Sequence, residues 1–212
     1  MNLLGNCSSG KIGQQVAAPG VTVIDQGNLP GERGSIPFSS EGEPSGKTVL
    51  IENGVLKSYM RSLQDALRRK TKSTGNGRRQ DFKNIPITRM TVTYIANGTM
   101  NPEDIIKSVK YGMYFREGDV SDGQVNKASG KFNMNTVLGF MIRDGEIDWT
   151  KPLKGATLIG DGPTFIQNID MVGNDLKIEK GAGTCGKKGQ ALAVSVGQPT
   201  IRAKMTVGGP KK

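Results

Sequence analysis

Glycine is the residue type that most constrains how this chain can fold, because it makes up 30 of the 212 residues. That share is roughly double the usual value of about 7%. Glycine destabilises helix interiors and readily adopts the backbone angles that tight turns require. The composition therefore favours many turns and short strands over long helices, in a chain long enough to bury a sizeable core.

Two dipeptides, Asn53-Gly54 and Asp144-Gly145, predict β-hairpins. Each lies between runs of β-branched and apolar residues, a setting in which Asn-Gly and Asp-Gly are typical of two-residue type I′ turns. Further strands are expected where short apolar or alternating segments recur between turn residues. The expected strands cover residues 21–24, 48–52, 55–59, 87–95, 112–115, 123–128, 131–135, 137–142, 146–149, 177–179, 192–196 and 200–207.

Three segments have a helical pattern instead. In residues 60–70, Met60, Leu63 and Leu67 fall on one helical face and predict a short amphipathic helix. Asn101-Pro102, followed by two acids, predicts a helix start, because asparagine caps a helix and proline suits its first turn. A third helix is expected over residues 163–172. The apolar positions expected in the last two helices are Ile105, Ile106, Val109, Phe165, Ile166, Ile169 and Met171.

Together these segments predict an α+β fold with a mainly antiparallel β-sheet, about three short helices and glycine-rich loops. Strands and helices do not alternate regularly, which argues against a parallel sheet. We expect one domain over residues 1–212, with residues 1–20 as an irregular lead-in.

The formal charge of +10 raises the question of an anionic partner. Within the basic segment from Arg68 to Arg79, residues 73–79 form either a solvated surface loop or a loop that contacts anions through glycine N–H groups beside two arginines. Binding of nucleic acid is less expected, because the segment lacks interleaved aromatic residues and the whole chain has one Trp, four Tyr and six Phe.

Two further features bear on location. No window of the chain approaches the ~20 apolar residues that a spanning helix needs, so we expect no membrane partner. Two cysteines, Cys7 and Cys185, do not make a disulfide framework, which favours a reducing, cytoplasmic setting.

The chain contains no histidine, which excludes Ser-His-Asp and Cys-His sites and histidine-rich zinc sites. Residues 181–187 fit the first seven positions of the phosphate-loop pattern, but Lys188 stands where Ser or Thr is required. Cys185 is the one residue that looks poised for chemistry, in a glycine-rich stretch that we expect to be a loop. It is either a small buried residue or a metal ligand or reactive thiol.

Short segments in a fixed order resemble the TldD branch of the TldD/PmbA family of bacterial metalloproteases, C-terminal portion. They run over about residues 8 to 209. The segments are Ser9-Gly-Lys-Ile-Gly13, Val49-Leu-Ile-Glu-Asn-Gly-Val-Leu-Lys57, Thr74-Gly-Asn-Gly-Arg-Arg79, Gly123-Gln-Val125, Ser129-Gly-Lys-Phe132, Lys154-Gly-Ala-Thr-Leu-Ile-Gly160, Met171-Val-Gly-Asn-Asp-Leu176, Cys185-Gly-Lys-Lys-Gly-Gln190, Val196-Gly-Gln-Pro-Thr200 and Thr206-Val-Gly-Gly209.

The resemblance implies a zinc site built from two histidines of an H-E-x-x-x-H helix, whose glutamate is the general base, and a cysteine from the C-terminal glycine-rich region. Cys185 matches that cysteine, and the resemblance assigns no catalytic residue to this chain. The histidine motif is expected about twenty residues before Ser9. The resemblance therefore implies an N-terminally truncated metalloprotease domain, inactive by itself and poorly soluble in isolation.

The resemblance also implies the partners. The family pairs a TldD-like subunit with a metal-less PmbA-like subunit, and the pair admits unfolded peptides whose backbone adds to a sheet. Modulation of DNA gyrase is implied only indirectly, through processing of peptides that poison gyrase. Two alternatives stay open: a non-catalytic peptide-binding or assembly subunit of the same fold, and a basic nucleic-acid-binding module.

Overall fold

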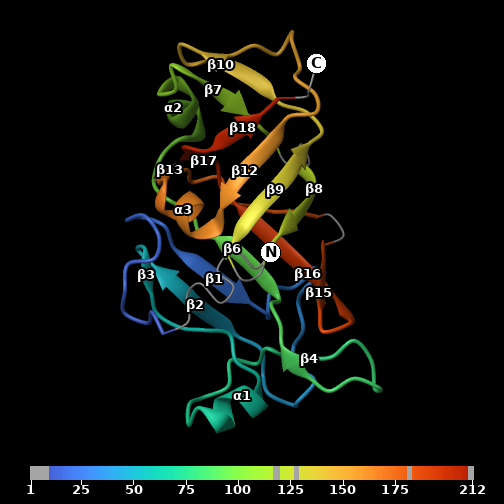
Figure 1. The fold of residues 1–212 in the computed structure, drawn as a ribbon. Helices are drawn as coiled ribbons and strands as arrows, with labels where there is room; N and C mark the ends of the chain where they lie inside the picture. The colour runs from blue at the N-terminus through green and yellow to red at the C-terminus, as the bar shows by residue number, and fades with distance from the viewer. Residues whose placement is uncertain (1–9, 117–119, 127–128, 181–182, 210–212) are drawn as a thin grey trace.

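The structure is a computed structural model of the 212-residue chain that describes residues 10–116, 120–126, 129–180 and 183–209. The described residues form many short strands and three helices of six residues each, which confirms the predicted α+β class (Figure 1). The strands are β1 Val23–Gln26, β2 Lys47–Glu52, β3 Val55–Leu56, β4 Gly77–Arg78, β5 Ile87–Thr88, β6 Val92–Ile95, β7 Tyr111–Tyr114, β8 Val120–Val125, β9 Lys131–Thr136, β10 Phe140–Arg143, β11 Glu146–Ile147, β12 Thr157–Asp161, β13 Ile169–Val172, β14 Lys177–Ile178, β15 Gly183–Lys187, β16 Gln190–Gln198, β17 Ile201–Ala203 and β18 Thr206–Gly208.

The largest sheet joins both ends of the described chain. Its order is β14-β16-β6-β1-β2-β3, and β15 pairs with β16 as a seventh strand. All of its pairings are antiparallel except β16 with β6, where residues 195–197 run parallel to residues 92–94. Because β16 is nine residues long, it pairs with β15 through its first half and with β6 and β14 through its second half.

Smaller sheets build the other end of the molecule. A four-stranded sheet has the order β18-β12-β9-β8, and a three-stranded sheet has the order β11-β10-β7. Figure 1 shows these sheets in the upper half of the view, with the large sheet below them and α1 at the bottom. Two further pairs, β13-β17 and β4-β5, complete the pairings of the described strands.

Both predicted hairpins are confirmed. Asn53 and Gly54 have φ of 48° and 82°, and Asp144 and Gly145 have φ of 48° and 83°, which are the positive angles of a type I′ turn. A third hairpin joins β15 to β16 through Lys188 and Gly189, with φ of 51° and 73°.

The prediction that Cys185 lies on a loop is therefore wrong, because residues 183–187 form strand β15. The sequence carries no sign of a strand and a tight turn here, because glycine is depleted in strands and lysine rarely adopts the left-handed backbone conformation that Lys188 has in the turn.

The helices are shorter than the sequence suggested. α1 covers Leu63–Arg68, and Ser62 caps it by accepting a hydrogen bond from the Asp65 amide. Its buried residue is Ala66, whereas Leu67 is 69% exposed, so Leu67 does not share a packed face with Met60 and Leu63 as the pattern predicted. A helix of six residues makes less than two turns, and five of the eleven residues in the predicted segment 60–70 lie outside it.

Of the other two predicted helices, the start of α2 is confirmed and the extent of α3 is corrected. α2 covers Pro102–Lys107 with Asn101 as its cap and Ile105 buried, as predicted. α3 covers Gly162–Gln167 and ends at Asn168, after which β13 begins, so a single helix over 163–172 is wrong. The predicted strands 87–95 and 200–207 are likewise each divided into two, β5 with β6 and β17 with β18.

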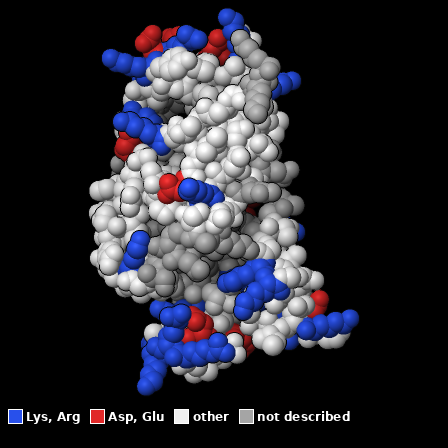
Figure 2. Space-filling view, in the orientation of Figure 1, with Lys and Arg blue, Asp and Glu red and all other residues white. Residues whose placement is uncertain are grey.

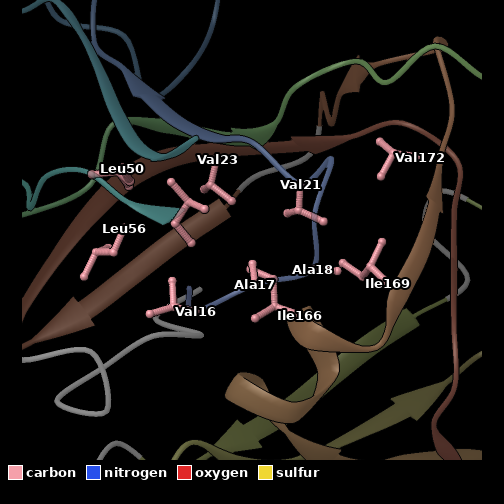
Figure 3. Close-up of a cluster of buried hydrophobic side chains, with 11 residues drawn as sticks. Val16, Ala17, Ala18, Val21, Val23, Leu50, Leu56, Ile166, Ile169 and Val172 are labelled. Carbon is pink, nitrogen blue, oxygen red and sulfur yellow. The ribbon is translucent and has the colours of Figure 1, made fainter. Parts of the chain in front are cut away.

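The main hydrophobic core lies between the large sheet and α3. Figure 3 shows side chains from the segment before β1, from β1 to β3, and from α3 and β13 pointing toward one another. Residues 16–18, part of the expected irregular lead-in, belong to this core. The buried members are Val16, Ala17, Ala18, Val21, Val23, Leu50, Ile51, Leu56, Ile166, Ile169 and Val172. No helix among the described residues is long and apolar enough to cross a membrane.

Candidate functional site: Cys185 on strand β15

Cys185 is the central residue of β15 and lies opposite Leu192 of β16. Its side chain is partly exposed and forms no disulfide. The thiol is therefore partly accessible. A small buried residue would be enclosed, whereas a metal ligand must be reachable by the metal, so the observed exposure favours the second interpretation of Cys185. A shallow hollow of about 320 Å³ adjoins it, lined by residues 186–191 around the hairpin turn. Cys7 lies outside the described residues.

The outer edge of β15 is open. In a two-residue hairpin the residues that flank the turn, here Lys187 and Gln190, form a hydrogen-bonded pair, and the pairs alternate from there. The backbone groups of Gly183 and Cys185 therefore point toward β16, and those of Thr184 and Gly186 point away from it. The latter groups make no hydrogen bond to any residue that the structure describes. Two unpaired positions thus flank Cys185 on an exposed strand edge.

Cationic side chains fix the position of this strand. The Arg33 guanidinium donates to the carbonyl oxygen of Gly183, and the Arg89 guanidinium donates to that of Cys185. Lys187 in turn donates from Nζ to the carbonyl oxygen of Thr88 at 3.1 Å. The strand that carries the cysteine is therefore held on the end of β5 and on the segment between β1 and β2 by charge-assisted hydrogen bonds, which are stronger than neutral ones.

A buried polar network lies beneath the hairpin and centres on Asp25 of β1. The Asp25 carboxylate, 2% exposed, accepts hydrogen bonds from Asn76 Nδ2 at 2.7 Å and from Thr93 Oγ1 at 2.6 Å. It also accepts from the Thr91 amide at 2.9 Å and from Thr91 Oγ1 at 2.7 Å. Four donors on one carboxylate satisfy a buried charge without a direct ion pair.

Two buried arginines lie next to this network. Arg78 donates to the carbonyl oxygens of Met90 at 2.5 Å and of Ala193 at 2.8 Å, and so connects β4 to β16. Burial lowers the pKa of Arg78 and the neighbouring Arg89 lowers it further, while Asp25 and Cys185 act in the opposite direction. Arg89 is 2% exposed, yet its Nε and NH1 atoms are buried without a hydrogen-bond partner.

The loop expected over residues 73–79 matches neither interpretation offered by its sequence. Gly75, Asn76, Gly77 and Arg78 are buried, so it is not a solvated loop throughout. The Arg78 guanidinium is used on backbone carbonyls and is not available to a ligand at the surface. Arginine suits such a role because it presents several donors in a fixed plane.

The sequence identifies Cys185 as a candidate ligand but does not identify the residues that position it. The arginine at 89 lies 96 positions before Cys185, and the one at 33 lies 150 positions before Gly183. Neither stands in a pattern that distinguishes it from a surface arginine. The one signal, for Arg89 alone, was its place inside the strand expected over residues 87–95, because a charged side chain that becomes buried in a strand needs a hydrogen-bond partner.

The profile of a known family, described as the PmbA/TldA metallopeptidase C-terminal domain, matches residues 4–209. The chain therefore belongs to the PmbA/TldD metallopeptidase family and corresponds to its C-terminal domain, as the resemblance of the short segments predicted.

Curated relatives place it closer to one branch. It is 45% identical over 199 residues to the metalloprotease TldD homolog of Buchnera aphidicola subsp. Acyrthosiphon pisum, covering 93% of this chain and 40% of the relative. It is 43% identical over 202 residues to the metalloprotease TldD homolog of Haemophilus influenzae, covering 95% of this chain and 41% of the relative. The chain thus spans about two fifths of the length of these relatives.

Solved structures share the fold. TldE from Thermococcus kodakarensis superposes with a TM-score of 0.73 at 25% identity, covering 95% of this chain and 42% of that one. A Thermotoga maritima protein described as a modulator of a DNA gyrase gives the same TM-score and coverage at 24% identity.

Proposed function

We propose that this chain is the C-terminal portion of a TldD-type zinc metalloprotease that hydrolyses unfolded peptides, with Cys185 as one protein ligand of the metal. The observation that carries the proposal is the family match over residues 4–209 together with a partly exposed Cys185 on an exposed strand. The metalloprotease names of relatives more than 40% identical support it.

Cys185 does not by itself fit a catalytic zinc site. Such sites use three protein ligands and a water molecule, which the zinc activates when it is bound. This sequence has no histidine, and no group of three His, Cys, Asp or Glu side chains suited to a metal occurs among the described residues. The proposal therefore requires that the other ligands and the general base come from residues other than those of this chain.

The open edge of β15 supports the peptide part of the proposal. An extended peptide could pair with the outward backbone groups of Thr184 and Gly186, which would bring its main chain beside Cys185. Recognition through main-chain hydrogen bonds is largely independent of sequence, as degradation of unfolded peptides requires. We further propose a PmbA-like subunit as the partner, as the family resemblance implies. We propose the cytoplasm as the location, because the unpaired Cys185 suits a reducing compartment.

A second candidate is a non-catalytic subunit that binds peptides or assembles with a metal-bearing subunit. The absence of histidine from the sequence favours it, because the chain then needs no metal of its own. The resemblance of the fold to TldE from Thermococcus kodakarensis is compatible with either candidate.

Metal content and reconstitution separate the two candidates. In the purified chain we expect well below one zinc per molecule, with little change in Cys185→Ala. Mixing the chain with a polypeptide that carries the family's histidine motif should then restore tight zinc binding and hydrolysis of an unfolded peptide, and Cys185→Ala and Cys185→Ser should fail to do so. If Cys185→Ala reconstitutes zinc binding and hydrolysis equally well, Cys185 is not a ligand and the second candidate is favoured.

A further inference from the structure

We propose that the open edge of β15 selects unfolded peptides that carry acidic side chains. This inference rests on the proposed pairing of a peptide with β15 and adds a chemical class of substrate to it. It follows from the charges around the strand, among which the positive ones exceed the negative ones.

Exposed cations lie at both ends of β15. Arg33 contacts one end of β15 at Gly183, and the turn at the other end carries the exposed Lys188. Neither cation has a salt bridge to a carboxylate among the residues that the structure describes. The sequence also contains no Asp or Glu after Glu179, so the β15–β16 hairpin has no negative charge of its own. In Figure 2, Lys and Arg side chains dominate the lower end of the molecule, where Figure 1 places α1, β4 and the hairpin.

The buried charges act in the same direction. Arg78 and Arg89 lie behind the hairpin and contact the Ala193 and Cys185 carbonyls, whereas Asp25 is the buried carboxylate of this network. Two positive groups and one negative group leave one excess positive charge. Arg89 has two nitrogen atoms without an acceptor, so its charge is poorly compensated locally. A charge in a low-dielectric interior acts over a longer distance than one in water, and it raises the potential at the strand above it.

The geometry specifies where the acids belong. Five strand residues span about 16 Å, so Arg33 and Lys188 lie near the two ends of a segment of about five paired peptide residues. Side chains four positions apart lie on the same face of a strand. A peptide with Glu at two such positions would place one carboxylate near each cation, whereas Lys at the same positions would meet like charges. Opposite charges across an interface favour the correct partner, and like charges reject the wrong one.

The test compares three labelled nine-residue peptides, identical except for Glu, Gln or Lys at two positions four apart. Binding to the full 212-residue chain is measured by fluorescence anisotropy at low and at high salt. We expect the Glu peptide to bind roughly 3- to 10-fold more tightly than the Gln peptide at low salt, the size of effect that two exposed charge pairs supply. The Lys peptide should bind most weakly, and salt should reduce the differences.

Variants and a backbone probe make the test specific. Arg33→Gln combined with Lys188→Gln should remove most of the preference for Glu, and the matched control Lys154→Gln, at an exposed lysine in the segment before β12, should keep it. Circular dichroism checks that each variant is folded. A Glu peptide N-methylated at alternate amides should bind at least 10-fold more weakly, because it cannot pair with an edge strand.

Three outcomes would each overturn a stated part of the proposal. If the Glu and Gln peptides bind equally while N-methylation weakens both, the acid preference is overturned and the pairing with β15 stands. If N-methylation has no effect, the pairing itself is wrong and both ideas fail. If single-stranded DNA of equal charge displaces the Glu peptide at the same concentration as unlabelled peptide, the surface is a general polyanion site and the preference for peptides is overturned.

Discussion

Replacement of Asp25 by asparagine tests how the buried network supports the hairpin. The carboxylate accepts four hydrogen bonds, two on each oxygen. In Asp25→Asn one oxygen becomes an amide group, and whichever side it occupies it faces a donor that cannot reverse. On one side that donor is the Thr91 amide. On the other it is Asn76 Nδ2, which also donates to the Arg89 carbonyl oxygen at 3.0 Å.

The magnitude follows from these contacts. Threonine hydroxyls can rotate and accept a bond, so only one donor pair remains unsatisfied, at about 1 to 3 kcal/mol. Loss of the negative charge also removes the buried carboxylate closest to compensating Arg78 and Arg89. Because Asp25 makes no direct ion pair with either arginine, this adds less than the roughly 3 to 5 kcal/mol of a broken buried ion pair, about 2 kcal/mol. We therefore expect Asp25→Asn to lower the free energy of unfolding by about 3 to 5 kcal/mol.

Urea denaturation followed by circular dichroism measures this change, and the midpoint should fall by more than roughly 1 M. Asp148→Asn is the matched control. Its carboxylate accepts bonds from Thr150 on the surface, at 3.1 Å from the amide and 2.5 Å from the hydroxyl, and it should leave the midpoint unchanged. A loss below about 1 kcal/mol in Asp25→Asn would refute the assignment of Asp25 as the compensating charge of the network.

Three further variants test other parts of the fold by the same unfolding assay. Gly54→Ala should destabilise the chain by more than about 2 kcal/mol, because a Cβ there would lie 2.5 Å from the Ala17 carbonyl oxygen and the backbone has φ +82°. Gly189→Ala is the control, because it has a similar φ and open space around it, and it should cost about 1 kcal/mol. Equal losses in the two variants would contradict the close packing around Gly54. Ile51→Ala, at a core position with no exposure, should cost about 2 to 5 kcal/mol, and Leu67→Ala, 69% exposed, should change stability by less than about 0.5 kcal/mol. The Arg202 guanidinium lowers the pKa of Asp170 through hydrogen bonds of 2.8 and 2.9 Å, so Asp170→Asn should cost up to about 1 kcal/mol at pH 7 for this half-exposed pair. The cost should shrink as the pH falls below the ordinary carboxyl pKa of about 3.9 and vanish below the lowered pKa of Asp170; a cost that is the same at pH 7 and pH 2 would exclude the ion pair as its cause.

The sequence predicted those elements whose signals are local. Asn53-Gly54 and Asp144-Gly145 form the expected turns because the dipeptides themselves tolerate positive φ. Asn101 caps α2 because the cap and the first turn lie within three residues. In these places the residues that determine the structure are also the residues that adopt it.

The elements that the sequence analysis placed wrongly depend on distant contacts. The single helix expected over 163–172 ends at Asn168 because the following residues pair with β17, more than thirty positions later. The segment around Cys185 becomes a strand because β16 pairs with it and because Arg33 and Arg89 bind its carbonyl oxygens. Local propensity carries no information about either partner, so tertiary pairing overrides it.

The same distinction applies to the candidate site. Chemistry can be predicted from the type of one residue, and the sequence therefore identified Cys185 as the group able to bind a metal. Position depends on what fixes the backbone of that residue. Here two arginines, 150 and 96 positions before the residues they contact, bind two carbonyl oxygens of one strand. Because both bonds are made to the backbone, they hold the strand in place and leave the thiol and the outer strand edge open to a ligand. A cysteine supported in this way needs no flexible loop, and a peptide that pairs with β15 would meet it in a fixed position.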